Sequence, residues 1–210
     1  MIGVFGGTFD PVHNGHLQVA LGLSQTIPFD ELRLIPCRLP PHRVVPQANT
    51  GDRVAMLQLA IADTAGLVID ERELRREGPS YMVDTLTSLR QELADESLVL
   101  ILGWDAFVGL PTWHRWSQII ELAHLLVVQR PGNIARPCDE VEALLQQAQV
   151  ETVSAFNQAS AGSVLLHPLD VLDVSSTAVR GLIAAQKDVS ELLPAAVLGY
   201  IKEHNLYQCK

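Results

Sequence analysis

Short apolar runs alternate with amphipathic stretches along this chain, and the alternation predicts a regular succession of strands and helices. Strands are expected at residues 2–5, 32–35, 67–69, 98–102, 125–128 and 164–166. Helices are expected at residues 15–25, 52–64, 138–149, 176–186 and 194–204. One more helix is indicated by apolar residues at helical spacing, Met82, Leu86, Leu89 and Leu93. The succession predicts an α/β fold, a doubly wound parallel sheet with helices on both faces and a helical C-terminal end.

Two connections stand out between these elements. Residues 36–46 contain four prolines, which predicts an extended loop. Residues 154–163 are rich in small and polar side chains, which predicts a surface loop. A chain of 210 residues without repeats or a composition shift is long enough for one complete core, so residues 1–210 are expected to form a single domain.

Composition narrows the classes of partner. A net charge of −9 argues against a nucleic-acid-binding surface, which needs a basic stripe. The apolar runs are far shorter than the ~18 residues of a membrane-spanning helix, and the chain starts without a basic leader, so a cytoplasmic location away from the membrane is expected. The three lysines, Lys187, Lys202 and Lys210, lie near the C-terminus. Phosphate chemistry in the first 180 residues must therefore use arginine, histidine, hydroxyl and backbone N–H groups.

Residues 6–16, between the first expected strand and helix, carry the clearest chemical pattern. Gly6 and Gly7 let backbone N–H groups approach an anion, and the helix that begins near Gly15 supplies further donors and a partial positive charge. His13 and His16 are three residues apart, so one helical turn can present both imidazoles to a polyphosphate oxygen. Ligands of parallel sheets bind where strands lead into helices, which is the position expected for this loop.

The residues alone leave a simpler interpretation open, in which residues 10–11 form a turn, Asn14 caps the helix and the two histidines are half exposed. The common nucleotide motifs G-x-G-x-x-G and G-x-x-x-x-G-K-[ST] do not occur in the chain. The His-x-x-His spacing lacks nearby carboxylate or thiol partners, and Cys37, Cys138 and Cys209 are isolated from one another. No metal ligand is therefore predicted among the protein's own side chains.

The run Gly-Gly-Thr-Phe-Asp-Pro-x-His-x-Gly-His at residues 6–16 matches the signature of a nucleotidyltransferase superfamily. The resemblance extends over nearly the whole chain. It is strongest to the bacterial nicotinate-mononucleotide adenylyltransferases, which make deamido-NAD from ATP and nicotinate mononucleotide. It implies a Rossmann-like fold. It also implies that ATP binds along the loop, at Gly6, Gly7, Thr8, Phe9, His13, Gly15 and His16, with Gly7 and Thr8 also at the acceptor nucleotide.

A second segment resembles another signature of the superfamily, S-S-T-x-x-R, at Ser175, Ser176, Thr177 and Arg180. Hydroxyls at a helix start with an arginine one turn later form an anion cradle, although taken alone they are better explained by an ordinary helix cap with a surface arginine. Paired with the first loop, the resemblance assigns all four residues to ATP. It makes His13, His16 and Arg180 the predicted catalytic residues.

Gly103 and Asp105 follow an expected strand and match the family's G-x-D, where the aspartate lies near the ribose of ATP. A carboxylate that accepts from vicinal hydroxyls is the usual sugar-binding group in such sheets. From the residues alone, Asp105 could equally be a favourable charge at a helix start.

Residues 79–86 resemble the family's P-S-Y-x-x-D-T-L and predict a proline turn that opens a helix. Tyr81, Asp84, Thr85 and Ser88 are expected to share the polar face of that helix. The resemblance places Thr85 at the pyridine ring of the acceptor and includes Tyr81 among the residues that bind nicotinate mononucleotide. Without it, an ordinary helix explains these residues.

Residues 111–113 resemble the family's P-T-W, and buried core tryptophans are the plain alternative. An electron-poor pyridinium stacks well on an indole, so the resemblance implies that Trp113 covers the nicotinate ring. The backbone N–H of His114, where relatives often carry tyrosine, would bind the nicotinate carboxylate and disfavour a carboxamide. His42 and Arg43, in a P-P-H-[KR] segment on the proline-rich loop, would bind the acceptor's phosphate, or would otherwise form a solvated turn.

The expected reaction is an in-line attack of the mononucleotide phosphate on the α-phosphorus of Mg-ATP, with pyrophosphate leaving. Catalysis would consist of positioning and charge stabilisation, and Mg²⁺ would be held mainly by ATP itself. Two alternatives remain at this point. The same chemistry could use nicotinamide mononucleotide or phosphopantetheine as acceptor, or the chain could be a nucleotide-binding regulator without turnover. The sequence does not indicate an oligomeric state.

Overall fold

A parallel sheet organises the chain in the computed structural model, which describes residues 1–41, 45–129 and 135–208. Its strands in these ranges are β1 (Ile2–Gly7), β2 (Glu31–Pro36), β3 (Leu67–Ile69), β4 (Leu98–Gly103), β5 (His124–Gln129), β6 (Gln149–Val150) and β7 (Val164–Pro168). They are arranged in the order β3-β2-β1-β4-β5-β7-β6, and every neighbouring pair is parallel. The predicted parallel α/β architecture is confirmed.

The helices lie where the apolar periodicity places them, within two or three residues at each end. Those predicted are α1 (Asn14–Thr26), α2 (Thr50–Ile61), α4 (Met82–Glu92), α7 (Asp139–Ala148), α8 (Ser176–Ala184) and α9 (Ala195–Glu203). Three short helices were not predicted, α3 (Arg72–Arg75), α5 (Trp104–Val108) and α6 (Ile119–Leu122). A helix of one turn repeats its apolar positions too few times to give a periodic signal.

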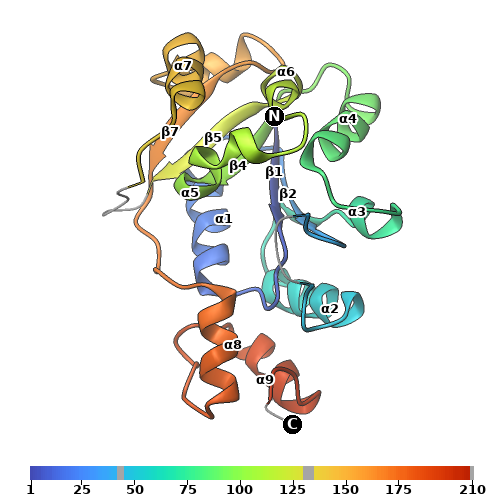
Figure 1. Ribbon diagram of the computed structural model, residues 1–210. Coiled ribbons are helices and arrows are strands. Elements are labelled where there is room, and N and C mark those ends of the chain that lie inside the picture. The colour runs from blue at the N-terminus through green and yellow to red at the C-terminus, as the bar shows by residue number, and fades with distance from the viewer. Residues whose placement is uncertain (42–44, 130–134, 209–210) are drawn as a thin grey trace.

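Helices cover both faces of the sheet and create two apolar cores. One core joins α1, α2, α8 and α9 to one face, and the other joins α4, α5, α6 and α7 to the opposite face. The central strands β4 and β5 are therefore buried on both sides, which explains why their sequences are nearly unbroken apolar runs. Figure 1 shows α8 and α9 together at one end of the molecule, beyond α1 and beside α2, which confirms the predicted helical C-terminal end. Among the described residues, no helix has both the length and the apolar content to span a membrane.

Two side chains in segments predicted to be polar are fully buried. Residues 154–163 are not only a surface loop, because a 3₁₀ helix (Val153–Asn157) buries Phe156 completely and stacks its ring on His124, with centroids 4.5 Å apart. Thr85 lies on the helix face predicted to be polar and bonds to Glu73 and Arg76, but it has 0% of its surface accessible. Both cases have one cause, since a single residue can be buried by a tertiary neighbour in a segment whose average composition is polar.

Candidate active site

The strand order reverses beside β1, which lies between β2 and β4. The pairs Ile2–Leu98 to Val4–Leu100 align β1 and β4 in parallel, so their carboxyl ends at Gly7 and Gly103 lie at the same edge of the sheet. Such a reversal opens a crevice between the loops that follow the two strands. The signature loop leaves β1 at this edge of the sheet and enters α1, as the sequence predicts.

His13 and His16 pack face to face at the start of α1. Their ring centroids are 3.7 Å apart and the planes are inclined by 24°. The His16 backbone N–H donates to His13 Nδ1 at 3.4 Å, and the His13 backbone N–H donates to His16 Nδ1 at 3.3 Å. His13 is therefore the N-cap of the helix, which replaces the cap by Asn14 that the simpler interpretation of the loop required.

This reciprocal cap sets the proton positions on both imidazoles. Because each Nδ1 accepts a hydrogen bond, the proton of the neutral ring is on Nε2. The two Nε2–H groups belong to adjacent, parallel rings and can act as a pair of donors to one anion. Their predicted role at the phosphates of ATP is compatible with this geometry and stays a prediction.

Close packing within the loop requires two of its glycines. A Cβ on Gly7 would lie 2.8 Å from Phe9 Cζ, and Phe9 is 1% exposed with a left-handed φ of 48°. A Cβ on Gly15 would lie 2.9 Å from Val174 Cγ1. The loop thus folds back on itself through Phe9, and α1 packs closely against the segment that leads into α8.

The signature loop is anchored by residues from distant parts of the chain. The Asp10 carboxylate, 2% exposed, accepts from the backbone N–H groups of Gln47 at 2.8 Å and Ala48 at 3.1 Å. It also accepts from the Tyr207 hydroxyl at 2.8 Å. Arg53, 1% exposed, donates from Nη1 to the Thr8 carbonyl at 2.7 Å. These four contacts hold the loop between β1, α2 and the C-terminal turn.

Sequence reasoning did not identify Arg53 and Tyr207 as parts of the site. Arg53 occupies a position in an amphipathic helix where charge usually indicates a solvent face, and Tyr207 is an isolated aromatic residue near the end of the chain. Burial and the neighbouring Asp10 carboxylate raise the pKa of the Tyr207 phenol, which keeps it protonated as a donor.

The second motif lies directly on the first loop. Ser175 caps α8 by accepting from the Ala178 N–H at 3.2 Å, and Ser176 Oγ donates to the Pro11 carbonyl at 3.0 Å. Arg180 donates from Nη1 to the Asp10 carbonyl at 2.7 Å. Its Nη2 donates to Thr177 Oγ1 at 3.2 Å. The structure therefore brings together two segments that are separated by more than 150 residues in the sequence.

Gly103 and Asp105 lie at the end of β4, at the same edge of the sheet. Gly103 is the N-cap of α5, and Asp105 is an exposed residue in the first turn of that helix. A carboxylate there is favourable beside the helix N-terminus whether or not a ribose is bound. The observed position of Asp105 is therefore expected both for a residue that binds ribose and for a favourable charge at a helix start.

The predicted acceptor residues gather around the start of α4. The rings of Tyr81 and His114 are 4.3 Å apart and inclined by 31°, and an ion pair joins Arg115 to Asp84 nearby. Trp113 is half-buried and contacts the core under α4 to α7. Its exposure is therefore intermediate between that of a core tryptophan and that of an open stacking surface. His42 and Arg43 lie outside the described residues.

A buried carboxylate that the sequence analysis missed lies under this region. Glu73, 3% exposed, accepts from the Thr85 hydroxyl at 2.6 Å, and Arg76 Nη2 donates to the same hydroxyl oxygen at 3.1 Å. Burial raises the pKa of Glu73 above its ordinary range. Since the Thr85 hydroxyl is occupied by these two partners, its predicted role at the pyridine ring depends on its methyl group and backbone.

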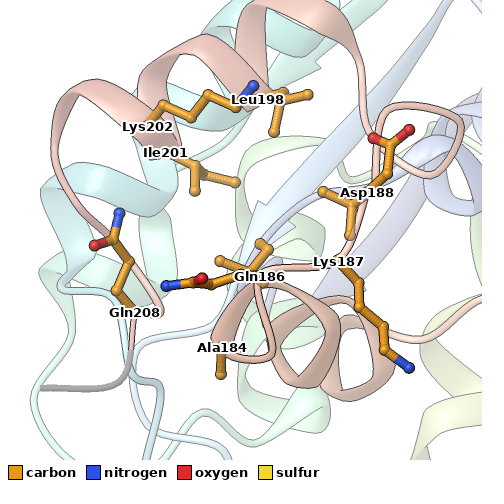
Figure 2. A pocket seen from close by; sticks show the side chains of 10 residues that line it. Ala184, Gln186, Lys187, Asp188, Leu198, Ile201, Lys202 and Gln208 are labelled. Carbon is orange, nitrogen blue, oxygen red and sulfur yellow. The ribbon is translucent and has the colours of Figure 1, made fainter.

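A pocket of about 470 Å³ lies elsewhere, between α8, α9 and the C-terminal turn. Figure 2 shows its lining side chains, with Lys202 above the apolar Ile201 and with Gln208 and Lys187 below it in this view. The pocket is lined by residues 183–208 and contains no residue of either signature motif. It is therefore separate from the crevice at the strand ends.

Comparison with known proteins decides the family. The family model described as cytidylyltransferase-like matches residues 4–182. A protein of Pseudomonas fluorescens, described as a probable nicotinate-nucleotide adenylyltransferase, is 48% identical over 208 residues, which are 99% of this chain and 97% of that protein. The chain belongs to the nicotinate-nucleotide adenylyltransferase family. A Pseudomonas aeruginosa member with the same description is 44% identical over the same shares of the two chains.

Solved structures agree with the fold of a nicotinate-nucleotide adenylyltransferase. The Plasmodium falciparum nicotinic acid mononucleotide adenylyltransferase complexed with NaAD superposes with a TM-score of 0.75 at 16% identity. The superposition covers 98% of this chain and 96% of that one. A Vibrio parahaemolyticus structure titled as a nicotinate-nucleotide adenylyltransferase gives a TM-score of 0.68 at 17% identity. At such low identities the likeness shows the fold alone, and the predicted Rossmann-like architecture is confirmed.

Proposed function

We propose that this protein transfers AMP from ATP to nicotinate mononucleotide and releases pyrophosphate, forming deamido-NAD. The observation that carries the proposal is the convergence of the two signature motifs, in which Arg180 and Ser176 bond directly to the loop that bears His13 and His16. This convergence puts the Arg180 guanidinium and the hydroxyls of the second motif on one surface beside the signature loop. Such a surface suits small phosphorylated substrates, and with a net charge of −9 the chain is not suited to bind nucleic acid.

In the proposed reaction, an oxygen of the mononucleotide phosphate forms a bond to the α-phosphorus of ATP. The bond from that phosphorus to the bridging oxygen breaks, and the electron pair leaves with pyrophosphate. The attacking phosphate is already ionised at neutral pH, so no general base is required. His13 and His16 donate through Nε2–H to the reacting phosphates, while Arg180 and Ser176 contact the leaving β- and γ-phosphates.

Mg²⁺ supports this chemistry by neutralising charge on the triphosphate. Among the described residues there is no group of three or more His, Cys, Asp or Glu side chains that could hold a metal ion. Asp10, the carboxylate within the signature loop, is fully engaged by backbone and Tyr207 donors. The residues therefore fit a metal ion that enters with ATP and is held mainly by its phosphate oxygens.

Preference for nicotinate over nicotinamide is proposed to arise at His114. Within the described ranges, no protein group accepts a hydrogen bond from the His114 backbone N–H. A carboxylate can accept from this N–H in any rotation of its two equivalent oxygens, whereas a carboxamide must turn its oxygen toward it. Trp113 and Tyr81 would then bound the pyridine ring, and His42 and Arg43 are proposed to bind the acceptor's phosphate.

The direct test supplies Mg-ATP with nicotinate mononucleotide, nicotinamide mononucleotide or phosphopantetheine in separate assays and measures pyrophosphate. We expect rapid release with nicotinate mononucleotide and slow release with its amide. Release with phosphopantetheine alone would overturn the acceptor, and no release with any acceptor would favour a binding protein without turnover.

A His16→Ala variant tests the catalytic assignment. We expect kcat to fall about 100-fold or more with little loss of stability, because the variant removes a donor to the transition state. His204→Ala is the matched control, since His204 also stacks on a ring, that of Tyr200 at 4.0 Å, but lies at the end of α9. Normal turnover of His16→Ala would refute the assignment.

A further inference from the structure

Tyr207 connects the end of the chain to the signature loop at its start. It follows α9 in a turn with a left-handed φ of 63°, is 9% exposed and contributes to the core under α1, α2, α8 and α9. Its hydroxyl donates to Asp10 Oδ1 at 2.8 Å across 197 positions of sequence. Gln208, the next residue, lines the separate pocket described above (Figure 2). The buried tyrosine is thus directed toward the loop and not into that pocket.

Asp10 is the point at which three other segments of the chain meet. Its carboxylate binds the N–H groups of Gln47 and Ala48, which lead from the proline-rich loop into α2. Its carbonyl accepts from Arg180 Nη1 at 2.7 Å, and the same Nη1 is 3.7 Å from Asp10 Oδ2. Arg180 therefore bonds to the backbone of Asp10 and lies at the outer limit of an ion pair with its side chain.

The Arg180 guanidinium can be attracted either by the Asp10 carboxylate or by the phosphates of a bound nucleotide. A carboxylate that accepts several hydrogen bonds has part of its charge neutralised and attracts a neighbouring cation less strongly. The Tyr207 hydroxyl supplies one of these bonds at Oδ1, between two side chains that are 9% and 2% exposed. Without it, the Asp10 carboxylate keeps only the two backbone donors, carries more uncompensated charge and should draw Arg180 from 3.7 Å into a closer ion pair.

We propose that Tyr207 is a positioning residue for ATP, whose hydroxyl holds the Asp10 carboxylate so that Arg180 remains available to the triphosphate. The inference rests on the proposed role of Arg180 at ATP and adds the C-terminal turn to the nucleotide site. The residue acts through Asp10 and Arg180 and does not touch the substrate.

The test compares Tyr207→Phe with Tyr200→Phe. Tyr200 is a matched control because its hydroxyl also donates to an aspartate, Asp52 Oδ1 at 3.0 Å, and also ties the C-terminal region to α2. For Tyr207→Phe we expect KM for ATP, and Kd for a non-hydrolysable ATP analogue, to rise about five- to tenfold, the effect of one ordinary hydrogen bond. KM for nicotinate mononucleotide should change less than twofold, and Tyr200→Phe should leave all three constants unchanged.

A double-mutant cycle tests whether Tyr207 acts through Asp10. In an Asp10→Asn background the charge that competes for Arg180 is absent, so adding Tyr207→Phe should alter analogue binding less than twofold. An equal effect in both backgrounds would overturn the proposed route.

Other outcomes separate this proposal from the proposed function. If the unmodified enzyme forms deamido-NAD while Tyr207→Phe binds the analogue normally, the positioning role is refuted and the function stands. If both tyrosine variants weaken the binding of ATP and of nicotinate mononucleotide equally, Tyr207 supports only the packing of the C-terminal region. If the unmodified protein turns over no acceptor, analogue binding by the two variants still decides the role of Tyr207.

Discussion

Gly7 ends β1 where the signature loop turns back, and a single added methyl group there should disturb the site. In Gly7→Ala the new Cβ would lie 2.8 and 2.9 Å from Phe9 Cζ and Cε1. Comfortable carbon contacts need about 3.5 Å, so the ring must retreat by roughly 0.7 Å. Phe9 is 1% exposed and its ring meets His16 edge-on at 5.0 Å, so this shift is transmitted to the histidine pair.

The expected losses follow from that displacement. Overpacking of a filled site costs about 1–3 kcal/mol of unfolding free energy, which for a chain of this size lowers Tm by about 2–4 °C per kcal/mol. A displacement of catalytic groups approaching 1 Å lowers kcat by up to about 100-fold. Both quantities are measurable, by thermal unfolding and by pyrophosphate release at saturating substrates.

Two further variants make the reasoning refutable. Gly199→Ala on α9 is the control, since its Cβ meets nothing within 4 Å, and it should be neutral or stabilising by about 0.5–1 kcal/mol. Adding Phe9→Leu to Gly7→Ala should recover part of the activity by relieving the collision. Normal Tm and kcat in Gly7→Ala would show that the ring does not constrain the loop.

Two more predictions concern Glu73 and Phe156. Burial raises the pKa of Glu73, so its contribution to stability is complete below its unfolded pKa of about 4.3 and is lost as the pH rises through the folded value. Glu73→Gln cannot ionise, so its stability relative to the unmodified chain should be higher at pH 7 than at pH 4 in urea titrations; the opposite sign would contradict the assignment. Phe156→Ala should cost about 3–5 kcal/mol in the same titrations, because the ring is fully buried against His124. Its kcat should be unchanged below the melting range, since Phe156 lies by the amino ends of the strands, where its carbonyl accepts from Ser97 Oγ just before β4.

Local chemistry decides much of this fold. Strands such as β4 and β5 can be predicted from the sequence because a strand covered on both faces must be apolar at nearly every position. The longer helices can be predicted from the sequence because their apolar positions repeat over several turns. A one-turn helix such as α3 and a single buried ring such as Phe156 leave no repeating pattern, so they could be found only in the structure.

The candidate site also has a part that the sequence predicts and a part that only the structure shows. Gly7, His13, His16 and the hydroxyls before Arg180 are local patterns with a chemical meaning, and the sequence by itself determined that they match a family signature. Which groups hold that signature in place was decided only by the tertiary structure.

Arg53, Glu73 and Tyr207 are ordinary polar residues in sequence, and they become functional candidates because folding buries each beside a partner from another segment. The Tyr207 hydroxyl meets Asp10 only after α8 and α9 have packed against α1 and α2. Burial and long-range pairing are properties of the assembled core. No window of neighbouring residues along the chain encodes them, which is the physical reason that the structure was needed.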